Sequence, residues 1–445
     1  MNIYISGISG TGMGPLALMA KQAGMKVCGS DLVKGAVYNE LMSAGIEVCI
    51  GEQDGEFLKR KLRDGVDWFV HTSALPRDHA ELRIAHDLGI KCTKRDDFTA
   101  FLVEKLGLKM VAVAGTHGKT TTTAMIVWGA LKMNLPIAYI VGTTLGFAPS
   151  GAYSPGDEFF VYEADEYDRN FLKYHPWLSV IPYVSYDHPD IYPTREDYLE
   201  AFEKFKGQSE MVVEKTPSGY RWKNMGEPIY EAKDFRLAGE ARRIDAGLAA
   251  DAVFEMMTSE LGSNDGMIDD RIIDTDLIIK VLNKFPGVGR RFERICDGVY
   301  SDYAHHPEEV RATIEIAMEQ AKIDGKKGVV VIYEPHQNTR QHEVIKGYKD
   351  AFVGADKVFW LPTYLTRENP ELPVLEPKDF IETLSNVEKA EPAELSPELW
   401  NTIEKYINDD YLVLLMTAGP ADAWLRKTIK NNYSKIKSFM LKLIV

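Results

Sequence analysis

A glycine-rich loop carries the most specific chemical signal in this sequence. It follows the strand-like run 109–115, precedes a helical segment, and contains Gly115, Thr116, His117, Gly118, Lys119, Thr120 and Thr121. Backbone N–H groups of such a turn and of the helix start bind phosphate oxygens. The lysine reaches the β- and γ-phosphates, and the hydroxyl of Thr120 coordinates Mg²⁺. We therefore predict that the loop binds ATP, although Val113 replaces the first glycine of the usual pattern.

Acidic and imidazole groups end or follow the next two apolar runs along the chain. They are Glu163, Asp165 and Glu166 at the end of the run 158–165, and Asp187 and His188 after the run 178–185. Strands of a parallel sheet end at one edge, where α/β proteins bind ligands. We predict that Thr120, Glu163 and His188 bind Mg²⁺ there, since carboxylates and neutral imidazoles ligate metals. Taken alone, a solvated acidic turn and a structural histidine would give the same patterns.

The last third of the chain carries a group of arginine and histidine residues, together with an aspartate and a tyrosine. It consists of Arg290, Arg291, Asp302, Tyr303, His305, His306 and Arg340. Adjacent arginines suit the binding of phosphate, and a histidine pair can orient a carboxylate or an amine. A zinc site is not supported, because neither an H-x-x-x-H spacing nor a neighbouring cysteine accompanies these histidines.

The N-terminus has a second glycine-rich turn. The run 3–7 leads into Gly7, Gly10, Thr11, Gly12 and Met13, and Asp31 follows the next expected strand. This arrangement is close to the dinucleotide-binding fingerprint. By itself it fits either a bound nucleotide or a tight strand-to-helix turn without a ligand. A nicotinamide nucleotide here would make the protein an oxidoreductase, but the second phosphate loop favours a nucleotide-linked substrate at this turn and ATP at the other.

Short apolar runs alternate with longer helical segments along the whole chain. This alternation predicts an α/β fold with mostly parallel sheets, and it restarts twice. We therefore predict three domains, residues 1–106, 107–285 and 286–445. The expected strands are 3–7, 26–29, 67–75, 109–115, 158–165, 178–185, 298–303, 328–335, 357–362 and 411–419. The stretch 225–283 is expected to be polar and helical.

Composition limits the classes of function. The 445 residues carry a net charge of −14, with 45% hydrophobic and 27% charged residues. These values indicate a soluble globular protein and argue against a nucleic-acid partner. The four cysteines are scattered, as expected in a reducing cytoplasm, and no apolar run reaches the ~18 residues of a membrane span. We expect a cytoplasmic protein without membrane insertion, present as a monomer or homodimer.

These motifs, in this order, resemble those of the Mur ligase family of cell-wall synthesis. The most specific matches are 114–121, 163–166, 187–188, 289–292 and 302–307, within a resemblance that covers roughly residues 1–420. The resemblance implies a Rossmann-like N-terminal domain that binds a UDP-sugar, a central P-loop ATPase domain, and a Rossmann-like C-terminal domain that binds an amino acid. It also implies a ligase that uses ATP and Mg²⁺ to activate a carboxylate as an acyl phosphate and then couples it to an amine.

Within the family, the sequence is most similar to the branch that joins L-alanine to UDP-N-acetylmuramate. The turn 7–13, the stretch 73–82, and His336, Thr339 and Arg340 carry this similarity. One alternative is the branch that attaches a ready-made tripeptide, to which four residues are similar. They are Tyr167, Ala304, Glu334 and Asn338. Another alternative is a nucleotide-binding protein that descends from a ligase.

The resemblance also assigns roles to residues. Lys119, His188, Arg290 and Arg291 would be catalytic, and Asp302 would contact the nucleotide together with the phosphate loop. The UDP-sugar and the amino acid would be bound by Gly10, Thr11, Gly12, Met13, Asp31, Ser73, Tyr303, His305, His306 and Arg340.

Three positions depart from the family pattern. Tyr183 stands where the family has an asparagine four residues before the Asp-His pair. The stretch 239–245 corresponds to the family's Gly-x-His-Asn-x-x-Asn motif, which helps to hold adenine, but lacks its histidine and both asparagines. Phe202 stands where some relatives carry a carbamylated lysine, so we expect none here. The altered adenine motif favours a binding protein, whereas the set of Lys119, Glu163 and His188 favours an enzyme.

Overall fold

The chain forms two compact units. The computed structural model describes residues 1–72, 75–188, 191–216, 219–223, 229–265, 273–366 and 368–431. The first unit comprises Met1–Arg236 and Arg242–Val288, and the second comprises Leu237–Ala241 and Gly289–Val445. Within the described residues, the first unit contains two β-sheets and the second contains one.

The N-terminal sheet of the first unit has five parallel strands in the order β3-β2-β1-β4-β5. The strands are β1 (Asn2–Ser6), β2 (Lys26–Asp31), β3 (Glu47–Ile50), β4 (Trp68–His71) and β5 (Lys91–Lys94). The helices are α1 (Gly14–Gln22), α2 (Tyr38–Ser43), α3 (Glu56–Leu62), α4 (Ala80–Asp87) and α5 (Arg95–Leu106). The chain adds β2 and β3 on one side of β1 and β4 and β5 on the other. The turn after β1 therefore lies at the switch point where open parallel sheets bind ligands.

The central sheet has seven strands in the order β12-β11-β10-β6-β9-β7-β8, with antiparallel pairs only at its two edges. The strands are β6 (Lys109–Val113), β7 (Ile137–Ile140), β8 (Gly151–Ala152), β9 (Phe159–Glu163), β10 (Leu178–Ile181), β11 (Met211–Thr216) and β12 (Gly219–Lys223). The helical segments are α6 (Lys119–Lys132), η1 (Tyr167–Lys173), α7 (Arg195–Gln208), η2 (Ala232–Asp234), α8 (Glu240–Asp265) and α9 (Thr275–Leu282). Because β6 lies between β10 and β9, the loop that follows β6 starts at the middle of the sheet.

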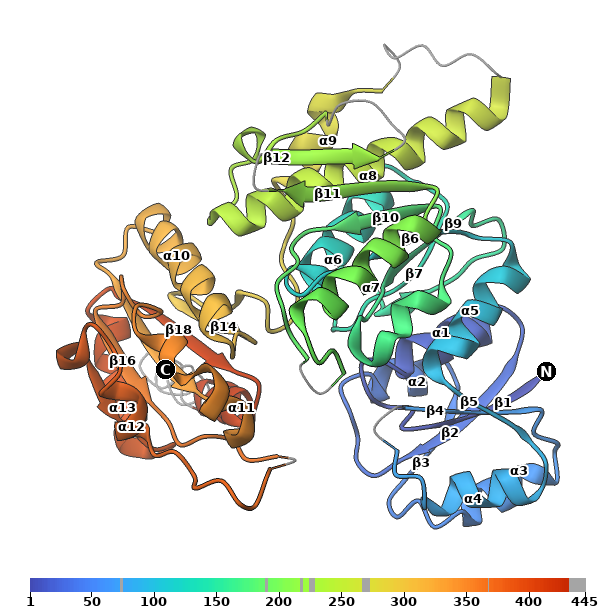
Figure 1. The fold of residues 1–445 in the computed structure, drawn as a ribbon, viewed down its shortest axis with the longest axis horizontal. Helices are drawn as coiled ribbons and strands as arrows, with labels where there is room; N and C mark the ends of the chain where they lie inside the picture. Colours follow the sequence, from blue (N-terminus) through green and yellow to red (C-terminus); the bar gives the residue numbers. More distant parts are fainter. Residues whose placement is uncertain are drawn as a thin grey trace, which may run out of the picture. The chain divides into compact units, whose positions relative to one another are not determined.

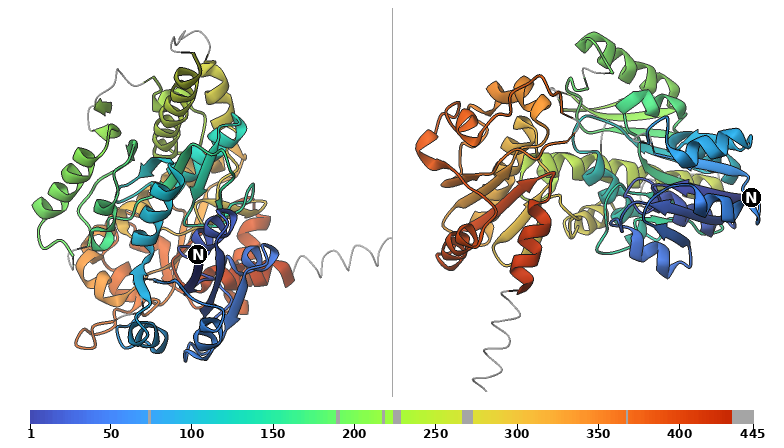
Figure 2. Two further views of the ribbon diagram at one scale, coloured as in Figure 1. Left: turned by 90° about the vertical axis from the view of Figure 1, so that its right-hand side faces the viewer. Right: turned by 90° about the horizontal axis from the view of Figure 1, so that it is seen from below.

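The two sheets of the first unit share one hydrophobic core. Helix α1 packs against β7 and β8, and α5 packs against η1, so these helices lie between the sheets (Figure 1). Figure 2 shows the blue N-terminal strands against the green central part in two further views. Leu16, Phe98 and Phe160 belong to the same buried cluster. The Ser150 N–H and hydroxyl each donate to the Glu40 carboxylate at 2.9 Å. The two glycine-rich turns are therefore held by a common core.

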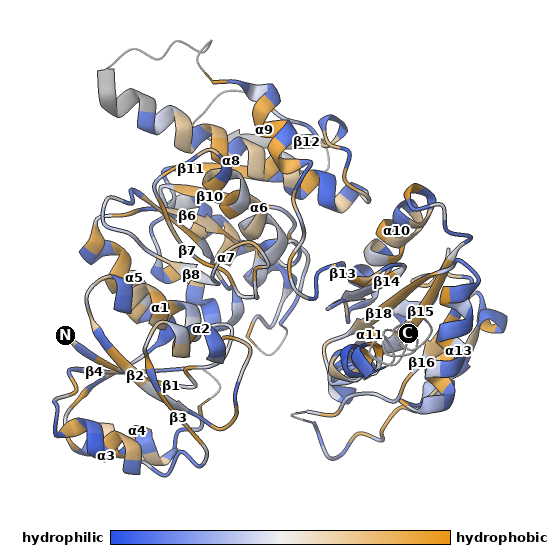
Figure 3. Cartoon of the chain, turned by 180° about the vertical axis from the view of Figure 1, so that it is seen from behind, coloured by the Kyte–Doolittle hydropathy of each residue, from blue (hydrophilic) through white to orange (hydrophobic). Residues whose placement is uncertain are grey.

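The second unit is a single sheet with helices on both faces. Its strands, in the order β13-β14-β18-β15-β16-β17, are β13 (Glu293–Cys296), β14 (Val299–Asp302), β18 (Leu412–Thr417), β15 (Val329–Glu334), β16 (Lys357–Trp360) and β17 (Ala390–Pro392). The helical segments are α10 (Pro307–Ile323), α11 (Asn338–Val344), η3 (Ile345–Tyr348), α12 (Pro377–Ile381), η4 (Val387–Lys389) and α13 (Pro397–Asn408). Strands β15 and β18 are hydrophobic along most of their length (Figure 3). Their alternate residues enter two different core clusters, as expected for strands buried on both faces.

The α/β class with mostly parallel sheets, predicted from the sequence, is confirmed. Each of the ten expected strands overlaps an observed strand, usually with a difference of one to three residues at its ends. The sequence did not predict the hairpin of β11 and β12. The stretch 225–283, predicted to be helical, contains η2, α8 and α9 among its described residues. Among the described residues, no helix combines the length and the apolar character required to span a bilayer.

Candidate active site

The phosphate loop leaves the end of β6 and enters α6 through two glycines with positive φ. Gly115 has φ +156° and Gly118 has φ +83°, a backbone region that disfavours other residues. A Cβ on Gly115 would lie 2.7 Å from the Tyr183 carbonyl oxygen, and one on Gly118 would lie 2.8 Å from Oδ1 of Asp245. Both glycines are thus required by the backbone conformation and by the close approach of Tyr183 and Asp245.

The Lys119 side chain is 15% exposed and pairs with a buried carboxylate. Its Nζ lies 2.8 Å from Oε2 and 3.0 Å from Oε1 of Glu166, and it also donates to the Gly115 carbonyl. Burial disfavours the charged amine, but the Glu166 and Asp165 carboxylates outweigh burial and raise the pKa of Lys119 above its usual value. Lys119 is therefore a permanent cation at the start of α6, where the helix dipole also favours anions.

Thr120 and Glu163 lie side by side, as the spacing of the motifs predicts. The Thr120 hydroxyl lies 2.9 and 3.0 Å from the two Glu163 carboxylate oxygens. The cause is strand register, because β6 and β9 are parallel neighbours in which Val113 pairs with Glu163. A hydroxyl and a carboxylate at this distance provide the oxygen ligands that Mg²⁺ prefers.

His188 lies close to Glu166 rather than to Glu163. Its Nε2 is 3.6 Å from Oε1 of Glu166 and 3.7 Å from Oδ2 of Asp187. Burial disfavours the charged ring, but Glu166 and Asp187 raise the pKa of His188 above its usual value. A protonated imidazole has no lone pair for a metal, so metal binding by His188 would release a proton.

The N-terminal turn is held by Asp31 and by a buried carboxylate beneath it. The Ser9 N–H and hydroxyl donate to Oδ2 of Asp31 at 2.9 and 2.7 Å. Glu81, 1% exposed, accepts from the Ser6 and Ser30 hydroxyls at 2.8 Å each. Asp31 therefore orders the turn, whether or not it also contacts a ligand.

The residues of the N-terminal turn that were predicted to bind the substrate differ in their access to the cavity. Thr11 and Gly12 line a cavity, whereas the Met13 side chain is buried in the core and its N–H donates to Gly10 O. Ser73, predicted from the sequence as a substrate residue, lies outside the described residues.

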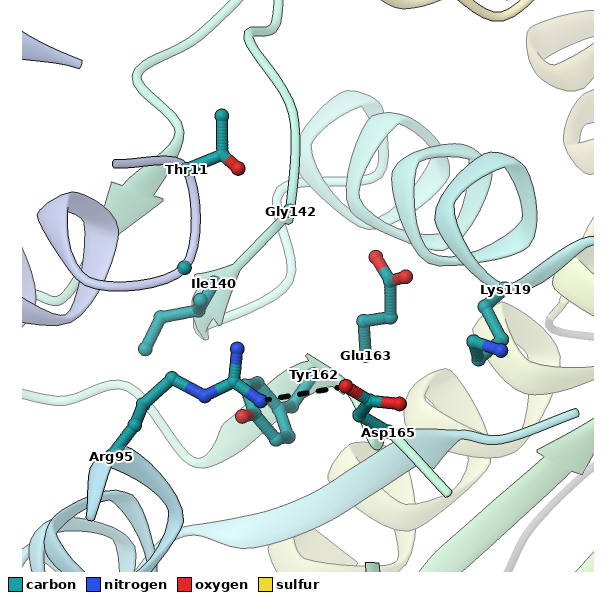
Figure 4. Close-up of a pocket in the computed structure, with 9 residues that line it drawn as sticks. Thr11, Arg95, Lys119, Ile140, Gly142, Tyr162, Glu163 and Asp165 are labelled. Atoms are coloured by element: carbon teal, nitrogen blue, oxygen red, sulfur yellow. Dashed lines mark ion pairs between the residues drawn. The ribbon is translucent and has the colours of Figure 1, made fainter. Parts of the chain in front are cut away.

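One cavity of about 240 Å³ joins the N-terminal turn to the phosphate loop within the first unit. It is lined by Thr11, Gly12, Arg95, Lys119, Ile140, Gly142, Tyr162, Glu163 and Asp165. Figure 4 shows Arg95 and Lys119 on opposite sides, with Glu163 and Asp165 between them. The cavity thus has a cation at each end and carboxylates in the middle.

In the second unit, both arginines of the pair flank one tyrosine. The guanidinium carbons of Arg290 and Arg291 lie 4.7 and 5.3 Å from the ring centroid of Tyr303. Arg290 has φ +56° and donates from Nη2 to the Thr417 carbonyl at 2.6 Å. These contacts fix two cations at the end of β14.

Asp302 is buried at the end of β14 and is engaged by the backbone. Its carboxylate accepts the N–H groups of Phe292 at 2.6 Å and Ala304 at 2.7 Å. Burial raises the pKa of Asp302 above its usual value. The residue therefore holds the arginine-containing loop against the loop that carries the histidines.

His305 and His306 differ in role despite their adjacency. The His305 ring makes edge contacts with Tyr303 and His336, with 5.6 Å between centroids in each case. Burial lowers the pKa of His305, so the ring is neutral at pH 7. His306 instead caps α10 in a capping box with Glu309. Arg340 lies in the first turn of α11.

Two family models match the chain over more than half of its length. The model described as the Mur ligase family, catalytic domain, matches residues 2–105, and the Mur ligase middle domain matches residues 113–247. A UDP-N-acetylmuramate–L-alanine ligase of Lactobacillus delbrueckii subsp. bulgaricus is 31% identical over 81% of this chain and 84% of that relative. The enzyme of the same name from Fusobacterium nucleatum subsp. nucleatum is 30% identical, with 94% of both chains covered. This chain belongs to the Mur ligase family.

Solved structures share the fold of this Mur ligase. The crystal structure of a UDP-N-acetylmuramate-alanine ligase from Thermotoga maritima covers 98% of this chain and all of its own, with a TM-score of 0.76 and 23% identity. A murein peptide ligase from Psychrobacter arcticus covers 97% of this chain and 98% of its own, with a TM-score of 0.58 and 20% identity. At these identities the likeness concerns the fold.

Two positions at which this Mur ligase departs from the family pattern, Tyr183 and Asp245, border the phosphate loop. Tyr183 is 48% exposed, and its ring stacks on His117 with centroids 5.7 Å apart and planes at 22°. Asp245, the last residue of the altered 239–245 stretch, has its carboxylate beside Gly118. Phe202 is buried and packs against Phe171 at 5.1 Å between centroids. An exposed aromatic ring and a carboxylate thus border the loop on this chain.

Some residues of the site were missed or underused in the sequence interpretation. Glu166 was assigned only to an acidic run, yet it pairs with Lys119 and lies beside His188. Arg95 and Asp165 were not assigned a role, although both line the cavity. Glu163 was found because polar residues at the carboxyl end of a parallel strand face the ligand site. Arg95 directly follows β5, so the same rule would have identified it.

Proposed function

We propose that this Mur ligase joins L-alanine to the carboxylate of UDP-N-acetylmuramate, with hydrolysis of ATP to ADP and phosphate, in the cytoplasmic synthesis of peptidoglycan precursors. The observation that carries the proposal is the cavity in which the N-terminal glycine-rich turn meets Lys119, Glu163 and Asp165. The relatives that are 31% and 30% identical over most of the chain bear the name of this activity. The enzyme is proposed to act as a monomer or homodimer.

The reaction has two steps. An oxygen of the substrate carboxylate attacks the γ-phosphorus of ATP, and ADP leaves, which gives an acyl phosphate. The amine of L-alanine then attacks the acyl carbon, phosphate leaves with the bridging oxygen, and the amine loses a proton. Because two anions must meet in the first step, catalysis depends mainly on positioning and on neutralisation of charge.

The central residues of the first unit are suited to ATP. The N–H groups of the loop 115–121 and the start of α6 would bind phosphate oxygens. Lys119 would exchange part of its pairing with Glu166 for the γ-phosphate, whose developing charge it would neutralise. The ring of Tyr183 offers a stacking surface for the base beside the loop.

Thr120 and Glu163 are the residues that would hold Mg²⁺, since their oxygens already lie within 3 Å of each other. His188 would join them only in its neutral form. When bound, Mg²⁺ would reduce the negative charge of the phosphates and so ease the approach of a carboxylate.

The second unit would bind the amino acid and assist transfer. Neutral His305, with Tyr303, His306 and Arg340, would form the walls of the amino-acid site, and His305 could accept a proton from the incoming amine. Arg290 and Arg291 would bind phosphate oxygens, and Asp302 would hold their loop in place through the N–H of Phe292. In this proposal residues 1–106 bind the UDP-sugar, 107–285 bind ATP, and 286–445 bind L-alanine.

Phosphate release tests the proposal. The purified protein is supplied with ATP, Mg²⁺, UDP-N-acetylmuramate and L-alanine, and each component is omitted in turn. We expect release only when all four are present, and faster release with L-alanine than with the tripeptide L-Ala-γ-D-Glu-meso-diaminopimelate. Release with the tripeptide alone would replace the proposal by the recycling activity. Binding of UDP-N-acetylmuramate without release under any condition would favour a nucleotide-binding protein.

A further inference from the structure

The side chain of Arg95 lines the cavity of the first unit, and the reaction described above assigns it no role. Arg95 is the first residue of α5, and its side chain, 25% exposed, reaches from the N-terminal sheet toward the central sheet. It lies beside Gly12. Figure 4 shows it with Thr11 on one side and Asp165 on the other. Its place between the N-terminal turn and Lys119 corresponds to the route that a UDP-sugar must follow to bring its carboxylate to ATP.

The guanidinium is held so that one edge faces the N-terminal turn. Nε and Nη2 donate to Oδ1 of Asp96 at 3.3 and 3.2 Å. Nη1 lies 2.9 Å from the position that a Cβ on Gly12 would take. Gly12 therefore lacks a side chain at the point where the arginine approaches the turn, and any larger residue would displace the guanidinium.

The partners of Arg95 allow exchange with an anionic ligand. Asp96 is 4% exposed and anchors the guanidinium from within the fold, and the Tyr162 and Tyr174 hydroxyls each donate to the same oxygen of Asp96 at 3.0 Å. Asp165 Oδ2 is 4.0 Å from Nη2, at the limit of an ion pair, and its side chain is 40% exposed. An incoming anion would thus compete with a weak exposed pair and would leave the buried anchor intact.

We propose that Arg95 binds an anionic group of the UDP-sugar substrate, either its diphosphate or its carboxylate, and so places the carboxylate toward Lys119. The inference rests on the proposed function. Planar guanidinium groups bind pairs of oxygens on phosphates and carboxylates through two parallel N–H···O bonds, a geometry that lysine cannot reproduce. Arg95 is therefore a binding and positioning residue, separate from the ATP-binding set of Lys119, Thr120 and Glu163.

The test compares Arg95→Met and Arg95→Lys with a matched control, Lys94→Met. Lys94 precedes Arg95 and pairs with Asp168, but it does not line the cavity. For each protein we would measure the KM for UDP-N-acetylmuramate and for ATP, the kcat, the melting temperature, and the Kd of UDP-N-acetylglucosamine. That last ligand has the same diphosphate but lacks the carboxylate.

We expect Arg95→Met to raise the KM for UDP-N-acetylmuramate about tenfold or more, while the KM for ATP changes less than about twofold. Arg95→Lys should recover only part of the loss, and Lys94→Met should resemble the unchanged protein. A weaker Kd for UDP-N-acetylglucosamine would identify the diphosphate as the group bound, and an unchanged Kd would identify the carboxylate.

Two results would overturn the inference. One is an unchanged KM for UDP-N-acetylmuramate in a folded Arg95→Met protein, or in Arg95→Lys if the methionine variant does not fold. The other is an equal rise in the KM values for ATP and UDP-N-acetylmuramate, which would mean that Arg95 only supports the cavity. If the unchanged protein neither binds UDP-N-acetylmuramate nor releases phosphate with it, the proposed function fails instead, and the two failures are thereby separated.

Discussion

The largely buried pair of Lys119 and Glu166 is the feature on which the chemistry of the first unit most depends. A lysine in this position needs a countercharge when no phosphate is near, because an isolated buried ammonium is costly. Glu166 supplies that countercharge, and it also approaches His188. Removal of either partner therefore affects both stability and catalysis, and the two effects must be measured separately.

Replacement of Lys119 by methionine should lower kcat by about 10³-fold, because the cation that neutralises the γ-phosphate is lost. It should also lower the free energy of unfolding by about 3 kcal/mol, since Glu166 would remain buried without its partner. The double variant Lys119→Met/Glu166→Gln should recover stability but not activity. Lys132→Met, at the other end of α6, is the control. Activity that returns with stability in the double variant would contradict a catalytic role for Lys119.

Tyr183→Ala should raise the KM for ATP about tenfold, because the exposed ring beside the loop is lost as a stacking surface for the base. Tyr183→Phe keeps the ring and should change the KM by less than about twofold. Inhibition by inorganic triphosphate, which has no base, should be the same in all three proteins. Equal losses of ATP and triphosphate binding would instead indicate damage to the phosphate loop.

At the residue scale, the sequence predicted the neighbours that strand order determines. Thr120 and Glu163 meet because β6 and β9 are adjacent parallel strands that end together. The pairing of Lys119 with Glu166, and the place of Asp245 beside Gly118, depend on how a loop and a distant helix pack. The spacing of motifs along the chain contains no information about such packing, so these contacts could not be predicted.

At the scale of elements, the junction between β6 and α6 combines two constraints at Gly118. Its φ of +83° is unfavourable for a residue with a side chain, and a Cβ would lie 2.8 Å from Oδ1 of Asp245. Gly118→Ala should therefore lower the free energy of unfolding by about 2 kcal/mol and weaken ATP binding. Chemical denaturation would measure the first effect.

Two further variants check this prediction. Gly118→Ala/Asp245→Ala removes the close approach but not the unfavourable φ, so it should recover only part of the stability. Gly146→Ala, where an added Cβ has no neighbour within 4 Å, should change stability by less than about 0.5 kcal/mol. If Gly146→Ala lowered the free energy of unfolding as much as Gly118→Ala, the backbone geometry of Gly118 would not explain the effect.

Helix α8 contains a carboxylate whose protonation should affect stability. Glu255 is 7% exposed, and burial raises its pKa from 4.5 to about 7. In the unfolded chain the pKa is close to the usual value, so the folded state binds the proton more tightly. The free energy of unfolding should thus fall as the pH rises from about 4.5 to about 7, by up to about 3 kcal/mol from this group, and remain lower above pH 7.

Glu255→Gln should cancel this loss. We expect the variant to unfold at higher denaturant concentration than the unchanged protein at pH 8, and at the same concentration at pH 4. Glu200→Gln, at an exposed position of α7, is the control and should have little effect at either pH. A stability difference between the Glu255 variant and the unchanged protein that does not depend on pH would contradict the burial argument.

Strands that are buried on both faces were easier to predict from the sequence than strands of mixed composition. Strands buried on both faces give continuous apolar runs, which is why β15 and β18 were predicted within a residue or two. Strand β3 and the hairpin of β11 and β12 contain Glu47, Glu214 and Arg221, and their mixed composition did not distinguish them from loops. Of these strands, β3 and β12 lie at the edges of their sheets, where a strand pairs with a neighbour on one side only, so the sequence signal for them is weaker.

At the scale of the whole molecule, the first unit combines two sheets whose loops meet in one cavity. The shared core, with α1 and α5 between the sheets, fixes the distance between the N-terminal turn and the phosphate loop. The proposed chemistry needs this arrangement, because a UDP-linked carboxylate must reach the terminal phosphate of ATP. The sequence predicted both turns, but only the fold shows that Thr11, Arg95 and Lys119 line the same space.

The central claim is that the carboxylate is activated by transfer of a phosphoryl group, and oxygen labelling tests it most directly. UDP-N-acetylmuramate with both carboxylate oxygens as ¹⁸O is incubated with ATP, Mg²⁺, L-alanine and the protein, and the released phosphate is analysed by mass spectrometry. An acyl phosphate passes its bridging oxygen to phosphate, so each phosphate should carry one ¹⁸O and each new amide should keep the other. Unlabelled phosphate, with both labels still in the sugar nucleotide, would contradict the proposed mechanism.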